Sequence, residues 1–102
     1  MINIRSLFKL KNNDGLTLKR GKKINYKSGW QVGTEGIETT DARSAMQAVK
    51  LFGGNCGIWY NNGIYYIDRS SRIPTKTEAI KLARECNQLS IYDWKKNNLV
   101  WC

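Results

Sequence analysis

Basic side chains near the start of the chain are the residues best suited to a binding chemistry. Residues 1–28 carry eight basic side chains and one acidic one, so this segment holds +7 of the net charge of +9 on the 102-residue chain. Such a one-sided field attracts phosphate backbones, anionic lipid or an acidic protein surface, and counterion release makes the attraction depend on salt. The alternative is that the charge serves solubility alone. We expect the nucleic-acid-binding residues of this segment to be Lys19, Arg20, Lys22, Lys23 and Lys27.

Aromatic side chains are the second candidate for ligand contact. Successive residues of a strand face opposite ways, so the neighbours Trp59 and Tyr60 cannot both be buried against helices on one face of a sheet. The same rule places Tyr92 and Trp94 on one side of their strand. We expect an outward aromatic surface made of Trp59, Tyr65, Tyr92 and Trp94. The cations expected to flank it and to bind nucleic acid with it are Arg69, Arg72, Lys95 and Lys96.

An outward aromatic surface with flanking cations is typical of proteins that stack unpaired bases. Sugars stack on such surfaces too. The alternative is that an N-terminal hairpin or a second subunit covers the rings and turns them into a second small core, because large bare apolar patches are rare on soluble monomers.

The chain has few residues of the types that act in catalysis. The chain has no histidine, which excludes Ser-His and Cys-His nucleophile pairs and histidine-containing zinc sites. The three cysteines, Cys56, Cys86 and Cys102, show no CxxC spacing, which argues against a zinc ribbon or a disulfide framework and favours a reducing cytoplasm. We therefore expect a cytoplasmic protein that is not an enzyme, with no catalytic residue, no metal and no cofactor.

Two helices and their hairpins are expected to position these residues. Asp41 is the expected cap of a helix reaching Phe52, and Thr75 with Glu78 forms a Thr-x-x-Glu capping box before a second helix. Each helix is followed by two short strands joined by an asparagine-containing turn, at 56–67 and 90–102, and a further strand is expected at 30–33. The fold class is α+β, with two helices on one face of a mostly antiparallel sheet in the order βαββαββ, a ferredoxin-like or SPOR-like plan.

The two helix–hairpin segments align with one another. With a shift of 34 to 35 residues, Trp59 falls on Trp94 and Asn62 on Asn97. The pattern predicts one unit used twice, an internal repeat.

The chain is expected to fold as one unit with two parts. Residues 29–102 are expected to form the α+β pseudo-repeat domain. Residues 1–28 are expected to form a basic N-terminal β-hairpin, because apolar residues alternate on both sides of a turn at 12–15; a flexible basic arm is the alternative.

Residues 29–94 resemble SPOR domains. The resemblance rests on strand "GWQVGT" before the helix at Asp41 and on strand "GIYYID" before "PTKTEAIKLA". It implies a tandem βαβ fold and binding of bare glycan strands of septal peptidoglycan. The RNA-recognition motif shares a βαββαβ plan, but the chain lacks its run of basic, glycine and aromatic residues.

These patterns favour a small, basic, non-enzymatic nucleic-acid-binding protein, with DNA or RNA as the ligand and no membrane contact. The first alternative is a protein–protein inhibitor of a host enzyme or defence complex, steered by charge. The second is SPOR-like glycan binding. The richness in Lys, Asn and Ile would suit a bacteriophage protein that modulates host machinery.

Overall fold

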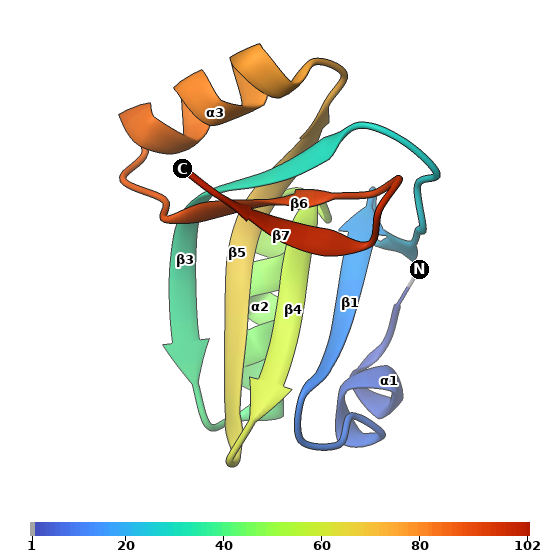
Figure 1. Ribbon diagram of the computed structural model, residues 1–102. Helices are drawn as coiled ribbons and strands as arrows, with labels where there is room; N and C mark the ends of the chain where they lie inside the picture. The colour runs from blue at the N-terminus through green and yellow to red at the C-terminus, as the bar shows by residue number, and fades with distance from the viewer. Residues whose placement is uncertain (1) are drawn as a thin grey trace. The chain divides into compact units, whose positions relative to one another are not determined.

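The computed structural model describes residues 2–102 and has an α+β fold, as the sequence predicts (Figure 1). Residue 1, the first of the expected segment 1–28, lies outside the described residues. In chain order the elements are α1 (Ile4–Phe8), β1 (Asp14–Lys19), β2 (Lys22–Lys23), β3 (Trp30–Thr39), α2 (Ala42–Leu51), β4 (Cys56–Asn61), β5 (Ile64–Ile73), α3 (Lys76–Glu85), β6 (Ser90–Asp93) and β7 (Asn98–Trp101). No helix among residues 2–102 has the length and apolar character needed to cross a membrane.

The strands are hydrogen-bonded in the order β2-β1-β4-β5-β3-β6-β7. The pairs β1–β2, β1–β4, β4–β5, β3–β6 and β6–β7 are antiparallel. The chain divides into two compact units. The first unit contains residues 2–24 and Gly36–Arg69, and the second contains Asn25–Glu35 and Ser70–Cys102. The long strands β3 and β5 contribute residues to both.

Helix α2 covers the sheet of the first unit. The Asp41 carboxylate caps the helix as expected, accepting from the Arg43 and Ser44 amides, and the Ser44 hydroxyl donates to it as well. These hydrogen bonds, led by the Ser44 hydroxyl, lower the pKa of Asp41. The buried alanine face of α2 packs on Ile58 and Ile67, which are 2% and 1% exposed. The small side chains let the helix approach the strands closely.

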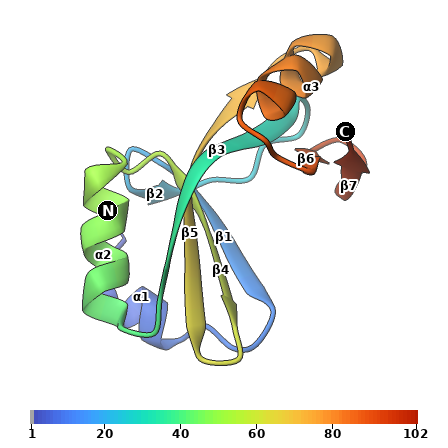
Figure 2. The ribbon, with the colours of Figure 1, turned by 90° about the vertical axis from the view of Figure 1, so that its left-hand side faces the viewer.

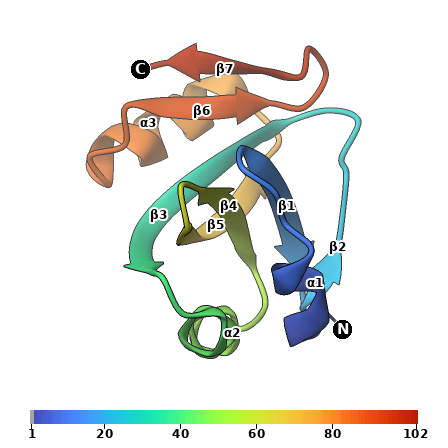
Figure 3. The ribbon, with the colours of Figure 1, turned by 90° about the horizontal axis from the view of Figure 1, so that it is seen from below.

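The N-terminal segment begins with a helix, so the expected strand over its first ten residues is wrong. Asn3 caps α1 by accepting from the Ser6 amide, and the helical turn places Leu7 in the core with no exposed surface. A strand would have spread the apolar residues of this short segment over two faces. Helices α1 and α2 lie side by side on the same side of β1, β4 and β5 (Figures 2 and 3).

Helix α3 provides the core of the second unit. Its buried residues Ala79 and Ala83 pack with Val32 and Ile91. The helix begins after Thr75 as expected, but the Thr75 side chain makes no cap hydrogen bond, so the predicted capping box is wrong. Because Thr75 and the first turn are exposed, water can satisfy the free amides instead.

The two central strands are longer than the sequence pattern indicated. β3 continues to Thr39 and β5 to Ile73, whereas the sequence predicts ends near residues 33 and 67. Glycine and serine residues obscure the alternation in these extensions, which non-local sheet pairing nevertheless stabilises.

Candidate nucleic-acid interface

The hairpin between β1 and β2 carries four of the predicted cations. Lys19 pairs with Lys22, so the hairpin closes through Arg20 and Gly21 alone. Both have positive φ, 52° and 77°, which is the geometry of the type I′ turn preferred in two-residue hairpins. The side chains of Lys19, Arg20, Lys22 and Lys23 are exposed.

Backbone hydrogen bonds hold the tip of this lysine hairpin (residues 19–23) in place. The Gly21 amide donates to the Gly54 carbonyl oxygen at 3.0 Å, and the Arg20 amide donates to Asn55 Oδ1 at 3.0 Å. From the other side, the Ile2 amide donates to the Gly21 carbonyl oxygen at 2.6 Å. The charges are therefore presented by a fixed turn, which lowers the entropy cost of ligand binding.

The charge of the lysine hairpin is uncompensated. Lys19 and Lys22 lie directly opposite one another, an arrangement of like charges that destabilises a free hairpin. Neither they nor Lys23 form an ion pair with any acidic group among residues 2–102. The first unit as a whole has ten basic and four acidic side chains, a net charge of +6. An anion placed between Lys19 and Lys22 would relieve the repulsion.

Strand register shows which other residues share a sheet face with these lysines. The face turned toward α1 and α2 carries the buried residues Leu18, Ile58 and Ile67. Residues between them in sequence point to the opposite side, which no helix of the first unit covers. We call this side the open face. It carries Gly15, Thr17, Lys19, Lys22, Gly57, Trp59, Tyr66 and Asp68.

A pair of aromatic rings lies on the open face. Trp59 is 41% exposed and directly opposite Tyr66, with ring centroids 4.8 Å apart and an interplanar angle of 31°. The Trp59 indole N–H donates to Asn13 Oδ1 at 3.1 Å, which fixes the orientation of the ring. Trp59 is thus where the sequence predicted it, on an outward surface. The two rings form a platform on which a planar group can stack.

An acidic side chain lies between the platform and the lysines. Asp68 is opposite Gly57 and accepts from the Gly57 amide at 3.0 Å. A Cβ on residue 57 would lie 2.6 Å from Asp68 Oδ1, so glycine is what allows this approach. Burial raises the pKa of Asp68 to about 6, against the opposing effect of the Gly57 hydrogen bond. Burial, with the nearby Asp68 charge, also raises the pKa of Cys56 to about 12, which makes that thiol a poor nucleophile.

Two predicted residues of the first unit lie on the helix side instead. Tyr65 is 6% exposed, so its assignment to the aromatic surface is wrong. Its hydroxyl donates to the Leu7 carbonyl oxygen at 3.2 Å, and burial raises its pKa. Part of the N-terminal segment therefore covers this ring, as the alternative interpretation held. Arg69 lies over the Phe52 ring, 5.1 Å from its centroid, on the same side.

In the second unit, Trp94 is also buried, at 7% exposure, so its place in the expected surface is wrong. Its indole N–H donates to Gln31 Oε1 at 3.1 Å, and its ring meets the edges of Tyr26 and Tyr92 at centroid distances of 5.6 and 5.0 Å. Tyr92 is half-buried. The sequence alone could not show that Tyr26, distant in the chain, packs on this ring.

The predicted cationic side chains of the second unit differ in whether they are bonded within the unit or exposed to solvent. Arg72 donates from Nε to the Ser28 carbonyl oxygen at 2.8 Å and lies over the Tyr26 ring, so it is occupied within the unit. Lys27, Lys95 and Lys96 have exposed side chains. The amides of Lys95 and Lys96 both donate to Asp93 Oδ1, which fixes the turn that carries them.

The β6–β7 hairpin carries two exposed apolar residues that the sequence interpretation missed. Leu99 is 56% exposed and Trp101 is 70% exposed. Register places them opposite Tyr92 and Ser90, on one face of the β6–β7 hairpin. The three successive residues Leu99, Val100 and Trp101 are all apolar, so the sequence showed no alternation; in the structure Val100 packs on the core and its two neighbours face the other way.

Within residues 2–102, no three Cys, Asp or Glu side chains come close enough together to hold a metal ion. No protein-family model, curated protein or solved structure matches the chain. The resemblance to SPOR domains therefore stays a prediction.

Proposed function

We propose that the protein binds single-stranded nucleic acid through the open face of the first unit. The observation that carries the proposal is the presence, on one sheet face, of the fixed, uncompensated lysine pair Lys19 and Lys22 and of the platform formed by the exposed Trp59 and the half-buried Tyr66. Cations track the phosphate backbone and rings accept bases, and neither contact needs a base sequence.

The spacing of the two elements suits a strand that runs along β1. Gly15, opposite Trp59, and Lys19 are four residues apart on the same strand, a separation of roughly 13 Å at the rise of an antiparallel strand. A base stacked on Trp59 would therefore have the phosphates of neighbouring nucleotides within reach of the lysines. Duplex DNA keeps its bases paired and offers the platform nothing to stack.

The proposal is tested by fluorescence anisotropy with labelled single-stranded DNA, single-stranded RNA and duplex DNA, at about 50 and 200 mM salt. We expect single strands to bind more tightly than duplex and to weaken steeply as salt rises. The double variant with Lys19→Gln and Lys22→Gln should bind more weakly and depend less on salt. In a plot of log K against log salt concentration, the slope should become shallower by about 1.4 if two phosphate contacts are lost. Lys50→Gln is the matched control, because Lys50 is an exposed lysine of α2, on the other side of the sheet.

A Trp59→Ala variant separates stacking from charge. It should weaken binding of single strands by about 1–3 kcal/mol at every salt concentration, and the slope of log K against log salt concentration should not change. Equal binding of single strands and duplex by the parent protein, or full affinity in both the Trp59 and the lysine variants, would overturn the proposal.

A protein partner bound by the second unit is the second candidate function, favoured by the exposed Leu99 and Trp101. Large apolar side chains exposed beside basic ones are typical of contact surfaces, and Lys95 and Lys96 lie on the turn of the same hairpin. The candidate partner is an acidic protein surface. Capture from bacterial lysate that survives nuclease treatment, is lost in Trp101→Ala and persists in Trp59→Ala would support it; capture that disappears with nuclease would exclude it.

A further inference from the structure

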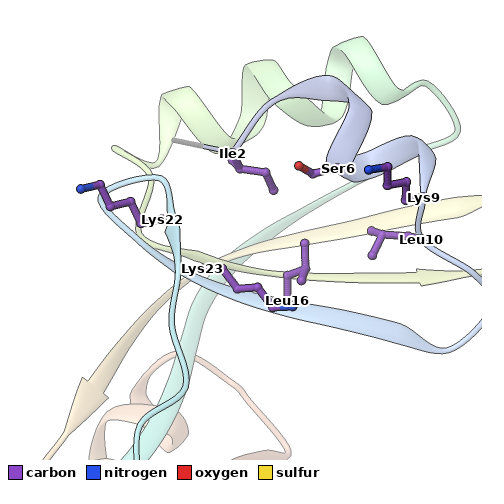
Figure 4. Close-up of a pocket in the computed structure, with 7 residues that line it drawn as sticks. All are labelled: Ile2, Ser6, Lys9, Leu10, Leu16, Lys22 and Lys23. Carbon is purple, nitrogen blue, oxygen red and sulfur yellow. The ribbon is translucent and has the colours of Figure 1, made fainter.

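A cavity of about 460 Å³ opens between α1 and the lysine hairpin (Figure 4). Its volume falls in the range of pockets that hold small molecules, about 300–1,000 Å³. It belongs entirely to the first unit and lies on the helix side of the sheet, away from the open face. The residues that line it are Ile2, Ser6, Lys9, Leu10, Leu16, Lys22 and Lys23.

The floor of the cavity is apolar. Ile2, Leu10 and Leu16 are half-buried and pack against the core of the first unit. Leu16 is two residues from the buried Leu18 on β1, so both point to the helix side. In Figure 4, Leu10 and Leu16 point into the space between the helix and the hairpin. An apolar group entering this space would lose contact with water on several sides.

The rim of the cavity is cationic. Lys23 is opposite Leu18 in the hairpin, which turns it to the same side as Leu16. Across the cavity, the Lys9 ammonium points toward Ser6, whose hydroxyl points the other way, toward Ile2 (Figure 4). The Lys22 ammonium points away from the cavity, so only the stem of that residue borders it. No acidic side chain is among the lining residues.

The two walls are fixed to one another before any ligand arrives. The Ile2 amide donates to the Gly21 carbonyl oxygen at 2.6 Å, which ties the start of the chain to the hairpin tip. The Ser6 amide is held by Asn3 Oδ1, and the Leu10 amide donates to the Leu7 carbonyl oxygen at 3.2 Å. A preformed cavity loses little entropy when it is filled.

We propose that this cavity binds a small amphipathic anion, with a phosphate or carboxylate head between Lys9 and Lys23 and an apolar body on Leu10 and Leu16. The head group accepts from the two ammonium groups. A free inorganic anion would leave the apolar floor in water, and a neutral apolar molecule would leave the lysines unpaired. The site therefore selects molecules that carry both parts.

The full chain is titrated with alkyl phosphates of increasing length, below their micelle concentrations, and binding is measured by calorimetry and by amide shifts of residues 2–23 in NMR spectra. Each added CH₂ group should tighten binding about fourfold until the cavity is filled, after which the affinity should level off. Inorganic phosphate and decanol should each bind at least about tenfold more weakly than decyl phosphate. Adenosine monophosphate, compared with decyl phosphate, distinguishes a nucleoside body from an alkyl body.

A Lys9→Gln variant separates this proposal from nucleic-acid binding. Lys9 lies outside the open face, so the change should weaken decyl phosphate by about tenfold and leave oligonucleotide affinity within about twofold. Lys50→Gln should change neither, and the exposure of both lysines makes unfolding of the variants a minor concern. Equal affinity for decyl phosphate and inorganic phosphate, shifts spread over both units, or an unchanged affinity in Lys9→Gln would overturn the proposal.

Discussion

The Gly21 amide donates to the Gly54 carbonyl oxygen at 3.0 Å, and the two backbones are so close that a Cβ on Gly54 would lie 2.8 Å from the Arg20 carbonyl carbon. The tip of the lysine hairpin and the turn that follows α2 meet here with no room for a side chain. This contact fixes the position of the lysine hairpin on which both proposals depend.

Replacing Gly54 should therefore be costly. Gly54→Ala puts a side chain against backbone atoms at a φ of +75°, and we expect it to lower the free energy of unfolding by at least about 2 kcal/mol. Gly63→Ala is the control, because Gly63 has a similar φ of +79° with nothing within 4 Å, and it should cost only about 1–2 kcal/mol. Urea unfolding of the two variants provides the measurement. Equal losses would mean that the contact between Gly54 and Gly21 does not constrain the hairpin.

A charge reversal at Lys22 should change stability and binding in opposite directions. Lys22→Glu turns a repulsive cross-strand pair with Lys19 into an attractive one, so the free protein should gain roughly 0.2–1 kcal/mol in free energy of unfolding. The same change removes a phosphate contact and adds repulsion, so oligonucleotide affinity should fall. Thermal unfolding should show the gain in stability, and fluorescence anisotropy on the same sample should show the loss of oligonucleotide affinity. A variant that loses both stability and affinity would point to damage to the fold.

Asp68 should make stability depend on pH in mildly acid solution. Its pKa is about 6 in the folded protein and about 3.8 ordinarily, so between these values the folded state binds more protons than the unfolded state. Stability from this group therefore falls as pH rises through that window and is lowest above it. The Asp68→Asn variant keeps an oxygen acceptor for the Gly57 amide, and its side chain does not titrate. Its stability advantage over the parent protein should grow from pH 4 and level off above about pH 7. A constant difference in urea unfolding across this range would show that the carboxyl titrates normally.

Two tryptophans of the second unit should respond differently to replacement by phenylalanine. The Trp30 indole N–H is buried without a hydrogen-bond partner, whereas that of Trp94 donates to Gln31 Oε1. Trp30→Phe removes an unsatisfied donor, and Trp94→Phe leaves an acceptor without its donor, which costs about 1–3 kcal/mol. We expect Trp94→Phe to be the more destabilising by at least about 1 kcal/mol in unfolding followed by circular dichroism. The reverse order would mean that ring packing, and not hydrogen bonding, sets the difference.

The sequence was sufficient to predict the α+β class and the two longer helices. Apolar residues recur at helical spacing after Asp41 and Thr75, and the turn at Asn62 and Gly63 has the positive φ values, 51° and 79°, that its residue types suggest. These signals depend only on residues that are close together in the sequence, so they can be read without knowing the tertiary contacts. Helix α1 was missed because five residues are too few to show a period, although the Asn3 cap before it was a readable start signal.

The candidate site was only partly predictable, because exposure depends on partners far away in the chain. Alternation correctly separated Trp59 from Tyr60, but it could not show which face α1 would cover, and so Tyr65 was placed on the wrong side. Trp94 is buried because Gln31 and Tyr26 reach it from more than sixty residues away in sequence. The cavity beneath α1 could not be foreseen without the helix.

The edge position of β2 gives its two lysines a second role. An unpaired sheet edge invites pairing with another chain, and charged side chains are a common protection against it. Lys22 and Lys23 make up the whole of this edge strand, so we expect the charges that we assign to ligand contact to oppose pairing between copies of the protein as well. A bound polyanion would neutralise these charges and remove this protection. We therefore expect mixtures of protein and oligonucleotide to aggregate at lower protein concentration than the protein alone.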